Sequence, residues 1–224
     1  GVFGPTAPRP GRLRIAWAGS VAGLPVDPDC AAAAESLALL FQSAGHHVEE
    51  AWPDIRDPGP AHDLLGAVEE YRARGALLAS HPDLLAPETC AMMVAGQAAT
   101  ADDIAAARAV SVETTSRMRD FMAGRDIFIL PATACPAFPL RQPPIMIGGR
   151  TVRPDWPSYA PFNMLANITG FPVATLPMGL SADGLPVGAL AFAGFGRDDL
   201  LLAALAEAEA LRGPFPAAPF TPTH

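Results

Sequence analysis

Near its N-terminus the chain changes from the two-residue period of a strand to the period of a helix and back again, and this change constrains the fold more than any other feature. Leu13, Ile15 and Trp17 are apolar at alternate positions, which predicts a half-buried strand. A helix is expected over residues 28–44 and a second short strand over 46–52. Strand, helix and strand within about 40 residues is the layout of a parallel βαβ unit, so the sequence predicts an α/β fold.

The first expected helix has a start and a stop signal. Asp27 can accept hydrogen bonds from free N–H groups, and Pro28 suits the first helical position because its missing N–H is not needed there. Gly45 is the expected C-terminal stop. The apolar face between these signals holds Ala34, Leu37, Ala38 and Phe41.

Proline and capping residues divide the remainder of the chain. Thr100 and Asp103 resemble a capping box and predict a helix of about six turns that ends near Gly124. Pro82 and Pro87 predict short helical pieces before it, because proline interrupts a helix. Further helices are expected over 61–79, 158–167 and 197–212, and strands over 126–130, 173–176 and 187–192, the last two joined by a hairpin turn at 181–184.

The stretch 135–161 contains seven prolines and has no hydrophobic period, so it is predicted to be one long loop. Long loops inside compact domains are usually functional or mobile. At the termini, residues 1–11 are expected to form a linker or an extended arm and residues 213–224 a Pro-rich tail. The expected domain therefore covers 12–212.

Composition argues against several partner classes. The net charge of −8 and the absence of a dense basic stretch argue against nucleic acid, which needs a cationic face. The longest nearly apolar stretch, 186–196, is shorter than the roughly 20 residues of a membrane span, so no membrane partner is predicted. The three cysteines form no disulfide framework, which favours a reducing, cytoplasmic location. The five histidines lack metal-binding spacing and no dinucleotide motif follows the first strand, so no metal or cofactor is predicted.

Four segments, taken in order, resemble the amidase signature family. They are DIFILPATACPAFP at 126–139, FNMLANITGFPVATLPMG at 162–179, DGLPVGALAFAGFG at 183–196 and the helix DDLLLAALAEAE at 198–209. The likeness extends over about residues 12–210 and is most specific after residue 126. It implies a mixed sheet flanked by helices, of which this chain would be the C-terminal part.

The resemblance also implies the hydrolysis of carboxylic amides by a serine nucleophile that a second serine and a lysine activate. A serine hydroxyl is a weak nucleophile until a neighbouring base takes its proton, and a neutral lysine can be that base. All 15 Lys+Arg residues here are arginine, and the one Gly-Gly pair is followed by Arg150, not serine. Codon bias in a GC-rich genome is another explanation for arginine in place of lysine. Under either explanation the chain lacks the lysine that would act as the base. We therefore predict no catalytic residue in this chain and no activity from the chain alone.

By the same resemblance, the C-terminal part supplies scaffold and one wall of the substrate pocket, toward which the Pro-rich loop reaches. The pocket-lining candidates are Thr133, Cys135, Trp156, Asn163 and Asn167. The simpler interpretation of the two asparagines is a cap or turn role, and that of the tryptophan is ordinary packing.

Two residues in the chain look superficially like nucleophiles. Ser20 lies in AGSVAG, where Ala18 replaces the first glycine of a nucleophile elbow, so a turn after the first strand is the better interpretation. Cys135 is followed by proline and fits a small buried residue better than a reactive thiol.

Three functional hypotheses remain open. The chain is the C-terminal portion of an amidase, with a small-molecule amide as substrate, the missing N-terminal catalytic half as partner and a homo-oligomer as a further option. Alternatively it is a free-standing α/β ligand-binding or scaffold domain without catalysis, or an amidotransferase subunit fragment. The absence of an initiating methionine leaves room for a removed N-terminal portion. A fragment should expose an apolar patch that binds hydrophobic dyes, whereas a stand-alone domain should not.

Overall fold

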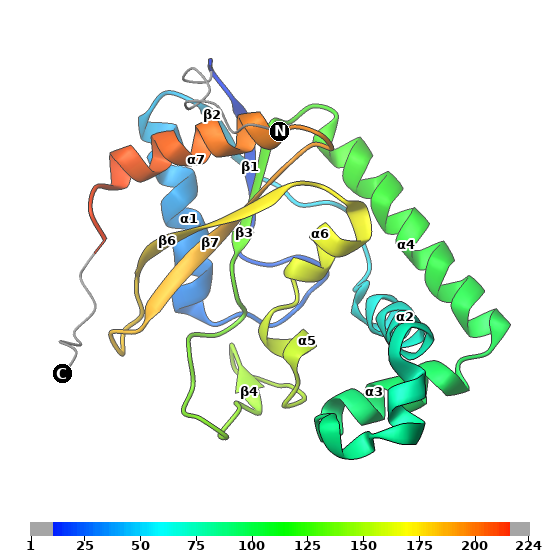
Figure 1. The fold of residues 1–224 in the computed structure, drawn as a ribbon. Helices are drawn as coiled ribbons and strands as arrows, with labels where there is room; N and C mark the ends of the chain where they lie inside the picture. Colours follow the sequence, from blue (N-terminus) through cyan, green and yellow to red (C-terminus); the bar gives the residue numbers. More distant parts are fainter. Residues whose placement is uncertain (1–10, 216–224) are drawn as a thin grey trace.

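A computed structural model describes residues 11–215, with five strands in one mixed sheet and helices on both faces (Figure 1). Most of the predicted arm and tail, residues 1–10 and 216–224, lies outside the described residues. The sheet order is β2-β1-β3-β7-β6. The strands are β1 (Arg14–Trp17), β2 (His47–Glu50), β3 (Ile127–Pro131), β6 (Val173–Leu180) and β7 (Pro186–Ala193). This arrangement confirms the predicted α/β class and mixed sheet.

The parallel half of the sheet contains the predicted βαβ unit. β1 pairs in parallel with β2, with Ile15 opposite Val48, and in parallel with β3 on its other side, with Ile15 opposite Ile127. The connecting helix α1 (Pro28–Ser43) begins where Asp27 accepts a hydrogen bond from the Asp29 N–H. The helix cap and the apolar periodicity therefore produce the βαβ unit that the sequence predicts.

The antiparallel half is the hairpin of β6 and β7, with β7 against β3. β6 is longer than the predicted 173–176 because a register shift between Pro177 and Gly179 lets pairing continue past the proline. The predicted turn is closed by the Ser181 N–H, which donates to the Leu185 carbonyl at 2.7 Å.

Each face of the sheet has its own apolar core. On one face, α1 and α7 (Asp198–Arg212) pack over alternate strand residues such as Ile127 and Ile129. On the other face, α4 (Ala101–Met122) and α6 (Asn163–Thr169) pack over Phe128, Leu130 and Phe192. β3 is buried at all five residues because it lies between these two cores.

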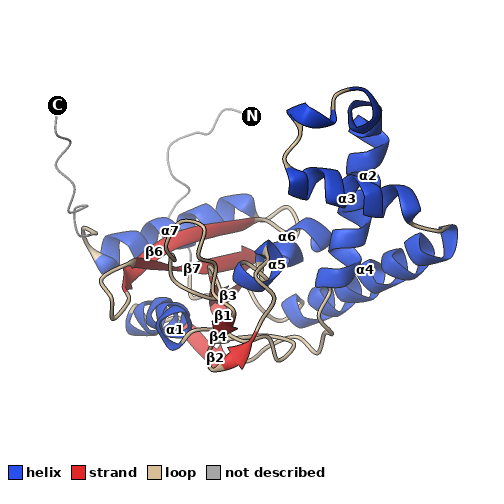
Figure 2. Cartoon of the chain, turned by 90° about the horizontal axis from the view of Figure 1, so that it is seen from below, coloured by secondary structure: helices blue, strands red, loops and turns tan. Residues whose placement is uncertain are grey.

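The helical region between β2 and β3 extends to one side of the sheet (Figure 2). α2 (Gly59–Ser80) and α3 (Pro87–Ala98) pack so closely that a Cβ on Gly96 would lie 2.0 Å from the Ala67 carbonyl oxygen. A short 3-10 turn, η1 (Pro82–Leu84), joins them, which confirms the predicted short pieces. At the start of α4, Thr100 and Asp103 form the predicted capping box.

The loop after β3 contains regular structure that the sequence analysis missed. A small hairpin, β4 (Met146–Ile147) and β5 (Arg150–Thr151), turns at two glycines with φ of 53° and 75°. The predicted helix 158–167 is wrong as one element. It is divided into α5 (Trp156–Tyr159) and α6, because Pro161 interrupts the pattern. None of the described helices is both long and apolar enough to cross a membrane.

Candidate functional site

Two loops meet at the carboxyl ends of the parallel strands β1 and β3. The chain passes from β1 to β2 on one side and later to β3 on the other, and open α/β sheets bind ligands at such a switch point. The loop after β1 is joined to the loop after β3 by the Asp27 N–H, which donates to the Ala134 carbonyl at 2.7 Å. This junction holds the loop after β1 against the loop after β3.

Thr133 and Cys135, two of the pocket candidates, lie together at the end of β3. The Thr133 hydroxyl donates to the Cys135 carbonyl oxygen at 2.8 Å and lies 3.9 Å from the Cys30 sulfur. Burial raises the pKa of the Cys30 thiol from its ordinary 9.0 to about 12, and nearby Asp27 adds to the effect. Burial and Asp27 also raise the pKa of Cys135. Both groups are therefore neutral thiols near pH 7, which argues against a thiolate nucleophile.

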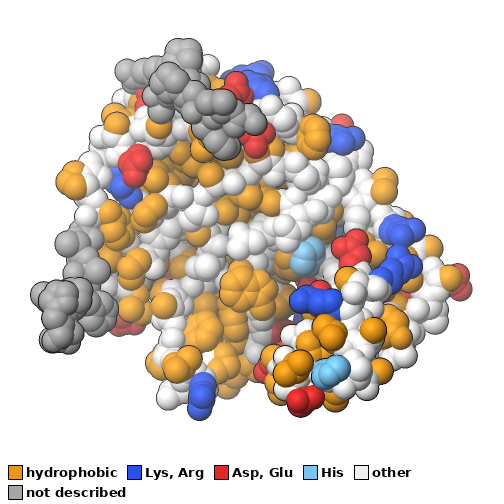
Figure 3. Space-filling model, viewed as in Figure 1, with side chains coloured by type: hydrophobic (Ala, Val, Ile, Leu, Met, Phe, Trp, Pro, Cys, Tyr) orange, Lys and Arg blue, Asp and Glu red, His pale blue; other side chains and the backbone are white. Residues whose placement is uncertain are grey.

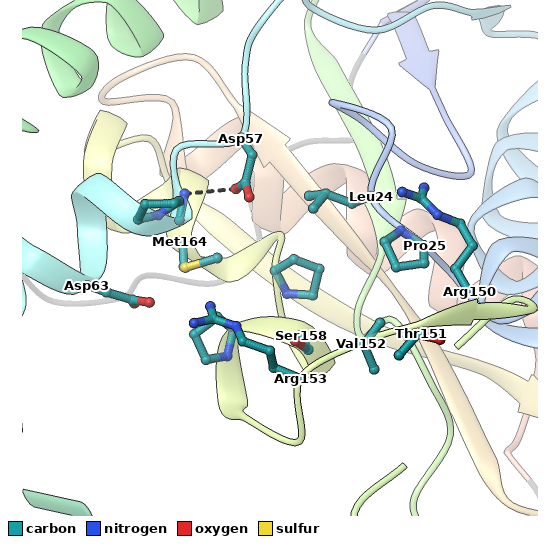
Figure 4. Close-up of a pocket in the computed structure, with 14 residues that line it drawn as sticks. Leu24, Pro25, Asp57, Asp63, Arg150, Thr151, Val152, Arg153, Ser158 and Met164 are labelled. Carbon is teal, nitrogen blue, oxygen red and sulfur yellow. Dashed lines mark hydrogen bonds between the residues drawn. The ribbon is translucent and has the colours of Figure 1, made fainter. Parts of the chain in front are cut away.

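A hollow of about 160 Å³ opens beside this junction, between the start of α2, the loop after β1 and the segment from β5 to α6 (Figure 4). Its walls are mostly apolar, and four charged side chains lie among them. The apolar lining residues include Leu24, Pro25, Val152, Pro161 and Met164. The charged residues are Asp57, Asp63, Arg150 and Arg153.

The protein itself engages these charged groups. Oδ1 of Asp57 accepts a hydrogen bond from the Gly59 N–H at 2.8 Å, at the first residue of α2. The Arg150 guanidinium donates to the Gly23 carbonyl, which ties β5 to the loop after β1. Nε of Arg153 lies 3.1 Å from the Asp155 carboxylate. The hollow therefore combines apolar walls with polar groups that the protein holds in place, and at about 160 Å³ it is smaller than the roughly 300–1,000 Å³ of a complete small-molecule site.

Trp156 and Asn163 flank this hollow without lining it. The tryptophan begins α5 and is 69% exposed, next to the lining residue Pro157. The asparagine begins α6 and is half-buried, next to the lining residue Met164.

Asn167 lies apart from the other candidates, in a shallower hollow between α2, α4 and α6. Its side-chain nitrogen lies 3.2 Å from Nε2 of His62, whose other ring nitrogen is 3.3 Å from Asp63. The structure thus joins Thr133 to Cys135 and places Trp156 and Asn163 next to residues that line the first hollow. It separates Asn167 from the other four candidates.

The sequence analysis did not select the charged lining residues. Asp57 and Asp63 lie about 90 residues before Arg150 and Arg153, and no periodic motif joins them. The two arginines lie in a Pro-rich loop that also contains Arg141 and Asp155, so charge alone does not single them out.

Ser20 has the turn role predicted for it. Its hydroxyl donates to the Leu24 carbonyl at 2.6 Å and closes the loop after β1. Among residues 11–215, no group of three or more His, Cys, Asp or Glu is placed to hold a metal ion.

Comparison with known proteins assigns the chain and its fold to a family. The family model described as Amidase matches residues 2–202. The chain belongs to the amidase family. This confirms the resemblance that the four sequence segments indicated.

Two curated relatives are similar to this amidase chain over most of its length. It is 30% identical over 223 residues to an acylamidase of Rhodococcus erythropolis, with 89% of the chain and 42% of the relative covered. It is 28% identical over 224 residues to a 6-aminohexanoate-cyclic-dimer hydrolase of Paenarthrobacter ureafaciens, with 89% of the chain and 44% of the relative covered. The chain thus spans less than half the length of these relatives.

Solved structures show the same fold. A bacterial aryl acylamidase of the amidase signature enzymes family superposes with a TM-score of 0.79 at 21% identity, covering 89% of the chain and 44% of that protein. A 6-aminohexanoate cyclic dimer hydrolase superposes with a TM-score of 0.71 at 27% identity, covering 92% of the chain and 48% of that protein. The mixed sheet and its flanking helices are therefore those of an amidase signature enzyme.

Proposed function

We propose that this chain is the C-terminal portion of an amidase that hydrolyses the C–N bond of carboxylic amides. The serine nucleophile, the second serine and the lysine base lie outside the chain in this proposal. The match of the amidase model to residues 2–202, in a chain without a single lysine, is the observation that supports it most directly. The two curated relatives, named acylamidase and 6-aminohexanoate-cyclic-dimer hydrolase, add support, and the chain spans less than half of each.

The chemistry of the chain's own residues supports the location of catalysis elsewhere. Amide hydrolysis by this route needs a hydroxyl, a base that removes its proton, and donors for the oxyanion. The Ser20 hydroxyl is committed to the Leu24 carbonyl, and the thiols of Cys30 and Cys135 are held neutral. None of them meets these requirements.

The role we assign to the chain is one wall of the substrate pocket. The hollow beside the β1–β3 junction offers apolar contact for the body of a small amide and polar groups at its rim. Thr133, Cys135, Trp156, Asn163 and Asn167 remain the proposed substrate-side residues, of which the first four lie at or beside the junction and the hollow.

The deciding experiment is to sequence the gene upstream of the Gly1 codon, size the native protein and assay both forms on simple carboxylic amides. We expect a product about twice as long, with a lysine and a Gly-Ser-rich loop upstream, that hydrolyses amides and loses activity when that lysine is changed to alanine. The 224-residue chain should be inactive. A native product that starts near Gly1, or turnover by the short chain that a serine-directed reagent abolishes, would contradict the proposal.

A further inference from the structure

Exposed apolar side chains gather on the segment 138–156. Of the sixteen large apolar side chains that are strongly exposed within the described residues, five lie in these nineteen positions. Their exposed fractions run from 40% to 86%. Figure 3 shows apolar side chains gathered at the lower centre of this face, where β4 and α5 lie. We call this set the apolar loop surface; it consists of Phe138, Leu140, Ile145, Met146 and Trp156.

The scaffold beneath the apolar loop surface is firmly held. A Cβ on Gly148 would lie 2.3 Å from the Val26 carbonyl oxygen, so the hairpin turn is pressed against the loop after β1. Ile147 is 3% exposed and packs with Ala134 and Tyr159. The hairpin that carries Met146 is therefore anchored, which lowers the entropy that a partner must remove on binding.

The charges around the surface are mainly positive. Segment 138–156 contains three arginines and one aspartate, in a chain whose net charge is −8. Apolar side chains with a tryptophan and arginines among them are typical of protein–protein interface cores, whereas isolated exposed apolar residues are ordinary. The complementary partner is apolar with acidic groups at its rim.

We propose that the apolar loop surface is where the N-terminal, catalytic portion of the longer amidase docks. This inference rests on the proposed function and adds the location of the contact. The length of the relatives identifies the occupant. The chain spans only 42% and 44% of its two curated relatives, so more than half of each relative is left to cover the apolar loop surface.

Docking of the N-terminal portion at this surface also completes the substrate hollow. Val152 and Arg153 line the hollow and lie in the same segment that carries the exposed side chains. A portion seated on Met146 and Trp156 adjoins this wall. The substrate-binding space is therefore shared between the two portions.

Methionine oxidation tests the contact directly. Dilute hydrogen peroxide converts the thioether sulfur of an exposed methionine to the sulfoxide and is itself reduced to water, at a rate that follows exposure. Met146 is 57% exposed, and Met92 on the distant α3 is 38% exposed and serves as the internal control. Peptide mass spectrometry measures the oxidation rates of Met146 and Met92 in the long gene product and in the 224-residue chain. We expect Met146 oxidation to slow about tenfold or more in the long product while Met92 is unchanged.

A pair of matched variants gives a second readout. Met146→Glu in the long product should lower its melting temperature and its amidase activity, because a charge is buried at the contact. Val112→Glu on α4, where the side chain is 70% exposed, should change neither. Equal effects of the two variants would argue against a contact at Met146.

Each outcome separates the two proposals. Oxidation of Met146 at the same rate in both forms overturns the docking surface, and leaves the proposed function intact if the long product still hydrolyses amides. Protection of Met146 that appears only with vesicles of anionic lipid overturns it in favour of a lipid surface. A gene product no longer than this chain removes the occupant and the proposed function together.

Discussion

One buried imidazole ring links three elements of the fold. His46 is 7% exposed, and its Nδ1 accepts the Leu13 backbone N–H at 3.0 Å, just before β1. Nε2 therefore carries the hydrogen and faces the Glu207 carboxylate on α7 at 3.3 Å. The ring also meets the edge of Phe41, in α1, at 5.5 Å between centroids.

Replacing this ring should be costly. His46→Ala leaves the buried Leu13 N–H without its acceptor, which we expect to lower the free energy of unfolding by about 1–3 kcal/mol, with a further loss from the cavity. The neighbouring His47→Ala removes an exposed side chain and should change it by less than about 0.5 kcal/mol. Urea unfolding followed by circular dichroism measures both. Similar midpoints for the two variants would show that the hydrogen bond to Leu13 contributes little.

At the scale of elements, the contact between α2 and α3 depends on a missing side chain. Gly96→Ala would place its Cβ 2.0 Å from a backbone carbonyl, which cannot move as a side chain can. Gly66 in α2 has nothing within 4 Å of the same position. We expect Gly96→Ala to destabilise the protein by several kcal/mol and Gly66→Ala to stabilise it by roughly 0.5–1 kcal/mol, the helix propensity gain of alanine. Thermal unfolding tests the opposite signs, and shifts of the same sign would refute the close contact.

Elements with a clear period were predictable from the sequence, and those without one were not. The apolar alternation around Ile15 and the capping residues Asp27 and Thr100 place their strand and helices within a few residues. β4 and β5 have two residues each, too few to show any period, so only the glycine pair 148–149 marks them. Their pairing depends on tertiary contact with the loop after β1.

The residues of the candidate site were predictable from the sequence only where they lie together in one short segment. Thr133 and Cys135 come from a motif at the end of β3, and the structure joins them by a hydrogen bond. The hollow brings together the start of α2 and the segment after β5, which lie far apart in the chain. Folding brings Asp57 and Arg153 to the lining of the same hollow. A single sequence gives no sign of this proximity.

At the scale of the whole molecule, the exposed apolar surface predicts the behaviour of the isolated chain. The 224-residue chain should enhance the fluorescence of anilinonaphthalene sulfonate, because that dye binds exposed apolar surface. Ile145→Ser with Met146→Ser should remove most of the signal, whereas Val94→Ser with Val112→Ser, on the helices beside the sheet, should remove little. A chain that does not enhance the dye would favour a stand-alone domain.

The hairpin of β4 and β5 is fixed chiefly through backbone atoms of its neighbours. The turn at Gly148 abuts the Val26 carbonyl, and Arg150 is bound to the Gly23 carbonyl. Carbonyl oxygens are the same whatever side chain a residue carries, so the contact with the turn does not depend on which side chain stands at position 26. The loop after β1 can therefore change its side chain at position 26 in the course of evolution while the hairpin, and the apolar side chains it displays, keep their place.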